Sequence, residues 1–394
     1  MKILAPVLPS QPRPLLVQAF TLIELMLSTA VLALLMALML TVVGQTQQIW
    51  VRSSGKVAQF QASRTAFEAM TRNLSQATLN TYYDLQFDSS GQTKGYSRNS
   101  DLHFVSGKAA QPKFLGTNAT NYPTHAVFFQ APLGQTAEMS GTGDTAAKKY
   151  RTLSNLLSSV GYYVKWGKDQ SLPPFITTAL VPDRNRFRLM EVIQPAESFS
   201  VADTVRLPKT SDWIQTALGI KALPKSTDPS APVGTQDSSR ALAENVVALI
   251  ILPKVSDKDS STAFLAPNYE YDSRPAKGDG TPKLRKDIAD TDAQVLRQFN
   301  QLPPVVRVTM VAIDEPSAIR QQSYSATAPT WTDGLFDKCT REEDIATSLG
   351  DPDAPQTNTL IYRLAPPPGT SGGPKMNYRI YTMDVIIRGS KWSN

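Results

Sequence analysis

The chain has few of the side chains that most often build metal sites and catalytic centres. Among its 394 residues there is one cysteine, Cys339, and there are two histidines, His103 and His125. A single cysteine excludes an intramolecular disulfide and a thiolate zinc cage. Two histidines leave little for a histidine-based metal site or a catalytic triad. We therefore expect no metal and no cofactor, and we predict that the chain is not an enzyme.

Net charge is also scarce. Lys and Arg number 40 against 34 Asp and Glu, which gives a dispersed surplus of +6 and makes nucleic acid an unlikely main partner. The length suffices for one large or two modest domains, and a hydrophobic content of 41% excludes a wholly disordered chain. The mean hydropathy of -0.23 is typical of a soluble protein, but it averages over a very uneven distribution.

One long apolar run lies near the N-terminus. From Phe20 to Val43 the sequence is FTLIELMLSTAVLALLMALMLTVV. As a helix rising about 1.5 Å per residue, this run spans roughly 36 Å, more than the roughly 30 Å hydrocarbon core of a bilayer. A cleaved secretory signal has an apolar region of only about 7–15 residues, followed by a small-residue cleavage site. The run is longer and has no clear site of that kind at its end, so we predict one transmembrane helix.

The residues before the apolar run indicate the orientation of the helix in the membrane. Met1 to Ala19 contains Lys2 and Arg13, four prolines and no acidic residue, so we expect an extended cytoplasmic segment and an N-in, C-out orientation. Glu24 is the exception within the apolar run. A carboxylate at the centre of a membrane helix costs about 2.5–3.5 kcal/mol, and less near an end. We therefore expect Glu24 to need a partner.

The sequence Ala19-Phe20-Thr21-Leu22-Ile23-Glu24-Leu25, followed by the apolar run, resembles the type IV prepilin cleavage and methylation motif. The resemblance implies that a prepilin peptidase cuts between Ala19 and Phe20 and that the new N-terminus of Phe20 is methylated. It also implies that Glu24, the fifth residue of the mature chain, pairs with the N-terminal ammonium of a neighbouring subunit during assembly. The family usually has glycine where this chain has Ala19. The alternative is an ordinary single-span anchor that keeps its leader.

The helix is predicted to continue beyond the apolar run. No proline occurs from Leu15 to Gln111. A helical stripe of apolar side chains is formed by Val57, Phe60, Phe67, Met70 and Leu74. We expect this stripe to pack on a β-sheet; a coiled-coil seam is the alternative.

The rest of the chain has the pattern of a β-rich domain with long loops. Segments rich in Val, Ile, Tyr and Phe predict strands at Leu102–Val105, Ala126–Gln130, Tyr162–Trp166, Arg186–Ile193, Asn245–Leu252, Val305–Ile313, Thr359–Leu364 and Tyr378–Arg388. Few helical segments separate them, so we expect antiparallel pairing. The almost wholly apolar Val246–Leu252 is expected to be a central strand.

Short helices are predicted at Asp212–Leu218, Ala289–Phe299 and Arg341–Leu349. Segments rich in Pro, Gly, Ser and Asp predict loops at Ala222–Arg240, Lys254–Asp287, Ser323–Asp337 and Ala365–Lys375. The predicted fold class is α+β, with a long N-terminal helix packed on an antiparallel β-sheet domain. Its parts are a leader (1–19), a transmembrane segment (20–43), the amphipathic second half of the helix (44–80) and a β-rich domain (81–394).

A long helix before a large sheet-rich domain resembles the J-type (also W-type) minor pseudopilins of type II secretion and type IV pilus systems. The segments Pro303–Met310 and Tyr378–Arg388 look like late strands of that group, and Ser63–Asp84 resembles Verru_Chthon cassette protein C. The resemblance implies a pilin-like structural subunit in the inner membrane, with a periplasmic domain, that is extracted into a pilus or pseudopilus. Its implied partners are a prepilin peptidase, other pseudopilins or pilins, and an inner-membrane assembly platform. The alternative function is a pilin-anchored display module that binds secreted cargo, a surface or DNA.

Several small patterns have both a functional and a structural interpretation. Asp101 and His103 lie two apart on a predicted strand, but no motif ties a nucleophile to them, so a core or surface histidine is favoured. The fragment Gly141-Thr142-Gly143-Asp144 lacks the strand and helix of a phosphate loop and is interpreted as a turn. Cys339 is interpreted as an incidental thiol.

Two charged patterns remain. Calcium prefers several oxygen ligands, and a group of aspartates consists of Asp272, Asp279, Asp287, Asp290 and Asp292. Lysines and an arginine lie between them, so a solvated loop is favoured over a calcium site. Arg184, Arg186 and Arg188 alternate on a predicted strand, which suggests either a basic face for DNA or anionic lipid or, as we favour, a hydrated strand face.

Overall fold

The computed structural model has an α+β fold with one long N-terminal helix and antiparallel sheets. It describes residues 21–391, except 88–89, 119, 137–154, 169–183, 204, 225–231, 234–236, 255–269, 290–291, 325–326, 337–341, 352, 354–355 and 370–374. Ala19, Phe20, the Gly141–Asp144 fragment, Asp290 and Cys339 therefore lie outside the described residues. The chain divides into two compact units, residues 1–55 and 56–394.

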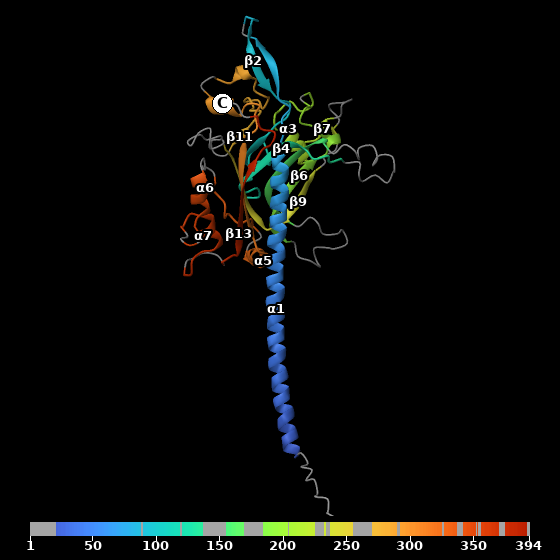
Figure 1. The fold of residues 1–394 in the computed structure, drawn as a ribbon, viewed down its shortest axis with the longest axis vertical. Coiled ribbons are helices and arrows are strands. Elements are labelled where there is room, and N and C mark those ends of the chain that lie inside the picture. Colours follow the sequence, from blue (N-terminus) through green and yellow to red (C-terminus); the bar gives the residue numbers. More distant parts are fainter. Residues whose placement is uncertain are drawn as a thin grey trace, which may run out of the picture. The chain divides into compact units, whose positions relative to one another are not determined.

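Helix α1 runs without interruption from Leu22 to Ser75 and contributes to both units (Figure 1). Its N-terminal part is long and apolar enough to cross a membrane, and the most apolar stretch has no buried residue. A surface of this kind is unfavourable in water and favourable in lipid. The helix ends a few residues before the predicted boundary at residue 80.

The C-terminal part of α1 packs in the core of the second unit. Phe67, Met70 and Leu74 are buried and Phe60 is half-buried, whereas Val57 is 54% exposed, so its assignment to the packing stripe is wrong. Gln59 Nε2 donates a hydrogen bond of 2.9 Å to the carbonyl oxygen of Glu244, and the carbonyl oxygen of Phe60 accepts one of 2.9 Å from the hydroxyl of Tyr381. The ring centroids of Phe67 and Tyr381 lie 5.8 Å apart.

The larger sheet has six strands in the order β11-β3-β4-β5-β6-β9, with every neighbouring pair antiparallel. The strands are β3 (Val105–Lys108), β4 (His125–Pro132), β5 (Leu157–Lys168), β6 (Asn185–Gln194), β9 (Ser239–Glu244) and β11 (Tyr271–Asp272). Strands β4, β5 and β6 coincide with predicted strands. Of the predicted Leu102–Val105, only Val105 belongs to a strand.

The second sheet has three antiparallel strands in the order β10-β12-β13: β10 (Val246–Lys254), β12 (Val305–Ile313) and β13 (Tyr378–Ile386). β10 is buried but lies at the edge of its sheet, so the prediction of a central strand is wrong. It is buried because it packs on β4, β5 and β6 of the other sheet. The backbone N–H groups of Leu249 and Ile251 donate to Thr124 Oγ1 (3.0 Å) and His125 Nδ1 (3.1 Å), which replaces part of a strand ladder.

Two small hairpins complete the described β-structure, β1 (Tyr82–Phe87) with β2 (Thr93–Asn99) and β7 (Leu223–Pro224) with β8 (Pro232–Val233). Neither hairpin was predicted from the sequence. The remaining helices are η2 (Ala196–Ser198), α3 (Asp212–Ala217), η4 (Arg285–Asp287), α4 (Ala293–Gln298), α5 (Glu315–Tyr324), α6 (Glu342–Leu349) and α7 (Leu360–Leu364). Helices α3, α4 and α6 lie within the three predicted helical segments.

The predicted strand Thr359–Leu364 is wrong, because these residues form α7. Thr359 is its N-cap, and its hydroxyl oxygen accepts a hydrogen bond of 3.3 Å from the backbone N–H of Tyr362. Leu360 and Leu364 are buried in the main hydrophobic core. A short apolar run is compatible with either a buried strand or a buried helical turn, and here the threonine cap and the core decide for the helix.

Candidate functional site

The first candidate site is the N-terminal turn of α1, where the motif residue Glu24 lies. Glu24 Oε2 accepts hydrogen bonds from the backbone N–H and from Oγ1 of Thr21, each at 3.0 Å. In return, the backbone N–H of Glu24 donates to Thr21 Oγ1 at 3.4 Å. This reciprocal arrangement is a capping box, so Glu24 already has a partner within its own helix turn. The spacing Thr-x-x-Glu before an apolar run is the sequence signal of a capping box, and this role of Glu24 was not predicted.

The other polar side chains of the apolar run are also satisfied within the helix. The hydroxyls of Ser28 and Thr29 donate to the carbonyl oxygens of Leu25 and Met26 at 3.0 Å. The hydroxyl of Thr41 donates to Ala37 in the same way, at 2.9 Å. Backbone groups in a lipid environment need internal partners, and hydroxyls that bond to their own helix satisfy that condition too.

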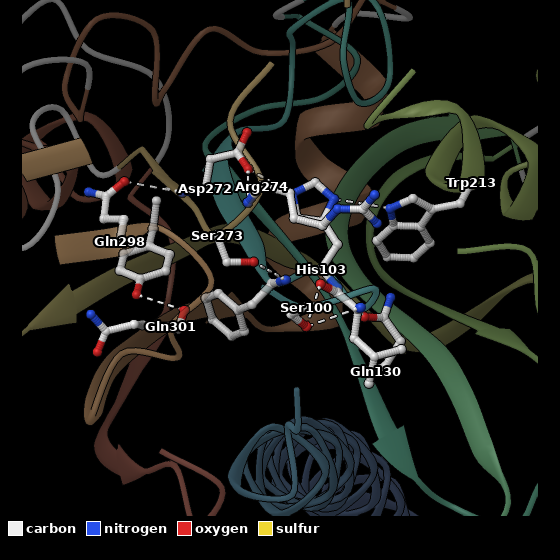
Figure 2. Close-up of polar contacts among 12 residues, drawn as sticks. Ser100, His103, Gln130, Trp213, Asp272, Ser273, Arg274, Gln298 and Gln301 are labelled. Carbon is white, nitrogen blue, oxygen red and sulfur yellow. Dashed lines mark hydrogen bonds and ion pairs between the residues drawn. The ribbon is translucent and has the colours of Figure 1, made fainter. Parts of the chain in front are cut away.

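The second candidate site is a polar cluster around the buried side chain of His103 (Figure 2). His103 Nε2 lies 2.7 Å from Asp272 Oδ1, and Trp213 Nε1 donates to His103 Nδ1 at 3.1 Å. An indole nitrogen can only donate, so Nδ1 is the acceptor and Nε2 carries the proton that is donated to Asp272. These contacts define a neutral imidazole with one tautomer.

Strand pairing and side chains together position this cluster. Pairing of β11 with β3 places Asp272 opposite Val105, next to the histidine segment. The hydroxyl of Ser273 accepts a hydrogen bond from the backbone N–H of Phe104 at 2.9 Å. On the other side, Gln130 Oε1 accepts one from the backbone N–H of His103 at 2.7 Å. Trp213 and Asp272 thereby bind the imidazole, while Gln130 and Ser273 hold the backbone of His103 and Phe104 (Figure 2).

Asp101, the carboxylate nearest to His103 in sequence, does not pair with it. Its oxygens accept hydrogen bonds from Asn80 Nδ2 (2.9 Å) and from the hydroxyl of Tyr82 (3.3 Å). The inference of a shared strand face is wrong, because β3 begins only at Val105 and residues 101–104 form no strand.

The electrostatics of the cluster favour an ionised Asp272. Burial raises the pKa of this carboxyl, but the hydrogen bond from His103, the charge of Lys113 and the backbone N–H of Arg274 hold its pKa below the ordinary value. Asp272 also accepts a hydrogen bond of 2.9 Å from that backbone N–H. Because both ring nitrogens of His103 are engaged, the imidazole has no free lone pair with which to activate a nucleophile. The geometry supports a structural role, the interpretation favoured for His103.

Two other aspartates of the suggested calcium group, Asp279 and Asp287, have separate partners. Asp279 Oδ1 accepts hydrogen bonds from the backbone N–H (2.9 Å) and the hydroxyl (2.6 Å) of Thr281. Asp287 pairs with Lys277 at 3.0 Å, and Asp292 is the N-cap of α4. Within the described part of the chain, no three His, Cys, Asp or Glu side chains come together as a metal site.

The arginines of β6 differ from both interpretations of a basic strand face. Arg186 is 5% exposed and forms two hydrogen bonds of 2.6 Å to Glu315 and one of 3.0 Å to Glu244. Arg188 is buried as well, and it donates to the carbonyl oxygens of Gly167 and Lys168. Arg186 and Arg188 are therefore neither hydrated nor available to a phosphate, and both interpretations are wrong for them. Arg184 is exposed.

Comparisons of the chain with protein-family models, curated proteins and solved structures found no match. A functional proposal therefore depends on the residues and their geometry. Of the two sites, the His103 cluster has a structural role, because both ring nitrogens of His103 are engaged in hydrogen bonds within the chain. The start of α1 combines a motif with an apolar helix that no described part of the chain covers.

Proposed function

We propose that the chain is a minor pseudopilin-like structural subunit of a type II secretion or type IV pilus-like assembly. It inserts in the inner membrane through the segment from Phe20 to Val43, with its C-terminal domain in the periplasm. A prepilin peptidase removes residues 1–19, and the subunit then leaves the bilayer and packs its helix against other pilins or pseudopilins at an inner-membrane assembly platform.

The main support for this proposal is that the two parts of α1 differ in burial. The N-terminal part of α1 exposes large apolar side chains, including Leu32, Leu35 and Met39. The C-terminal part of the same helix buries Phe67, Met70 and Leu74 in the core of the sheets. An apolar surface of this length is stable in lipid or against other apolar helices, and a subunit that moves from membrane to filament needs both options.

The position of Glu24 supports the proposal in a second way. Its carboxylate lies in the first turn of α1 and is held by Thr21 without a cation. A capped carboxylate at a helix N-terminus is stable in an isolated subunit, because the helix dipole favours negative charge there. In an assembly, the N-terminal ammonium of a neighbouring subunit would add the charge partner that a buried carboxylate requires.

Co-expression with a prepilin peptidase tests the proposal. We expect intact-mass and N-terminal analysis to find a chain that begins at Phe20 and carries one added methyl group. The matched variants are Ala19→Gly, which restores the usual residue before the cut and is expected to be processed at least as fast, and Ala19→Lys, which is expected to stay uncut. A chain that keeps residues 1–19 in both wild type and Ala19→Gly would contradict the proposal and favour an ordinary membrane anchor.

A further inference from the structure

The hairpin β1–β2 exposes an aromatic face that the proposed function does not use. The hairpin forms a two-stranded sheet of its own, and it extends beyond the two larger sheets in Figure 1, where it is cyan. Tyr83 is 70% exposed, Phe87 59% and Tyr96 77%. Isolated two-stranded hairpins are marginally stable in water, and clustered exposed aromatic side chains mark interaction surfaces more often than ordinary surface.

Strand register places these side chains together. Tyr83 lies opposite Arg98 and Leu85 lies opposite Tyr96. Residues that are opposite each other, or two apart along a strand, share a face, so these four side chains lie on one face of the hairpin. Phe87 follows Leu85 on the same side of β1. We call this set, Tyr83, Leu85, Phe87, Tyr96 and Arg98, the aromatic face.

A groove lies at the base of the aromatic face and shares two residues with it. It encloses about 140 Å³ and is lined by Tyr83 and Arg98 together with Asn300, Gln301, Leu302 and Lys391. The lining combines an exposed aromatic ring, an aliphatic side chain, two amides and cationic groups. Such a lining accepts a side chain with an apolar body and places positive charge beside it.

Among the described residues of this surface, the charged side chains are all cationic. Arg98 and Lys391 line the groove, and Lys94 is exposed at the irregularity of β2. The hairpin's Asp84 belongs to the opposite face, where its carboxylate accepts hydrogen bonds from Asn99 Nδ2 (3.3 Å) and the backbone N–H of Leu85 (2.9 Å). A partner that covers the aromatic face therefore gains from negative charge, whereas a second copy of the same face would bring lysines against lysines.

We propose that the aromatic face and its groove dock an extended acidic peptide segment of a partner protein. The segment runs along the hairpin as an added strand, places an apolar side chain in the groove beside Tyr83, and sets its carboxylates against Lys94, Arg98 and Lys391. A peptide is favoured over a single-stranded nucleic acid, because β1 and β2 each have an outer edge with which the backbone of a peptide can pair. Two backbone groups of the hairpin already have partners, since the N–H of Leu85 donates to Asp84 and the carbonyl oxygen of Arg98 accepts from Asn300. This docking does not depend on processing at Ala19.

Fluorescence anisotropy with the full chain in detergent micelles tests the proposal. The probe is a labelled synthetic peptide in which glutamate alternates with valine around one phenylalanine; the comparison probes are its lysine-for-glutamate version and a labelled oligo(dT). We expect saturable binding of the acidic peptide only. We expect Tyr83→Ala and Lys391→Glu each to weaken this binding by about tenfold or more, as for interface hot spots. Tyr82→Phe, on the opposite face of β1, is the matched control and is expected to bind as wild type.

A second measurement tests the added strand. N-methylation of alternate amides in the acidic peptide is expected to abolish binding in one of the two registers and to spare it in the other, because only one set of amides faces the hairpin edge. Equal binding of the lysine peptide, tighter binding of oligo(dT), self-association that the acidic peptide does not reverse, or no binding of the acidic peptide would each overturn the proposal. Lys391 is exposed, so Lys391→Glu keeps the test decisive even if Tyr83→Ala alters the hairpin.

Discussion

The carboxylate of Glu24 accepts two hydrogen bonds of 3.0 Å from Thr21, one from the backbone N–H and one from the hydroxyl. This contact gives the motif glutamate a role within its own subunit, as half of a helix cap. The proposed assembly gives it a second role, as the partner of a neighbour's ammonium. The two roles differ in one property, because a cap needs an acceptor oxygen and a charge pair needs a negative charge.

Glu24→Gln therefore separates the two roles. Glutamine keeps the acceptor oxygen of the capping box, whereas Glu24→Ala loses it. We expect both variants to insert in the membrane as wild type and both to enter the assembly at least tenfold less, since loss of one member of a buried charge pair costs about 3–5 kcal/mol. Cross-linking to neighbouring subunits in isolated membranes measures incorporation. Normal incorporation of Glu24→Gln would show that the carboxylate serves only as a cap.

The single cysteine makes the membrane orientation directly measurable. In a Cys339→Ser background, Thr93→Cys places a thiol on the exposed strand β2, and Ser10→Cys places one in the leader. We expect a membrane-impermeant maleimide to label Thr93→Cys in intact spheroplasts and to label Ser10→Cys only after lysis, because positive residues retain the leader in the cytoplasm. The reverse pattern would contradict the N-in, C-out orientation. The measurement uses cells without a prepilin peptidase, so that the leader stays attached.

The pH dependence of stability is expected to include a contribution from Asp272. Its pKa is lower in the folded chain than in the unfolded chain, where it is about 3.9. The contact network therefore contributes stability that is present above about pH 4 and is lost as the pH falls through the folded pKa. We expect Asp272→Asn, which retains an acceptor for His103, to lower stability at pH 7 and to reduce the further loss on acidification. Urea unfolding between pH 3 and 7 in detergent measures both, and identical pH profiles would contradict the assignment.

Two glycines of β5 provide a test of core packing. An added Cβ at Gly161 would overlap the ring of Phe128, whereas at Gly167 it would meet nothing within 4 Å. We expect Gly161→Ala to destabilise the domain by about 1–3 kcal/mol, because overpacking shifts side chains or backbone. Gly167→Ala, in the same strand, is expected to change stability by much less. Equal unfolding midpoints for the two variants would contradict the close packing of Phe128 on Gly161.

The parts of the fold that were predictable depend on local pattern. The long helix α1 was expected from its apolar run and from the absence of proline, and β4, β6, β12 and β13 from their β-branched and aromatic content. The hairpin β1–β2 was missed, because its strands YYDLQF and TKGYSRN are mostly polar and contain a single β-branched residue, Thr93. α7 was predicted as a strand, because its short apolar run has no period that separates helix from strand.

The contacts of the candidate sites could not be predicted from local pattern, because they join residues that are far apart in the sequence. His103 and Asp272 are 169 positions apart, and no spacing rule connects them. Arg186 was expected to be hydrated on a strand face, and it is buried because Glu315, at the start of α5, reaches it from 129 positions away. Both contacts satisfy charged or polar groups in the interior, where an unpaired group is costly.

The sequence by itself determined the apolar helix of membrane-spanning length and the motif around Glu24, because helical rise, hydropathy and motif spacing are properties of consecutive residues. Only the tertiary structure decided that β10 is a buried edge strand, that His103 is a neutral imidazole held between Asp272 and Trp213, and that Tyr83 and Tyr96 share one exposed face. These features depend on which strands pair and in which register, and register is set by packing between segments that are distant in the chain.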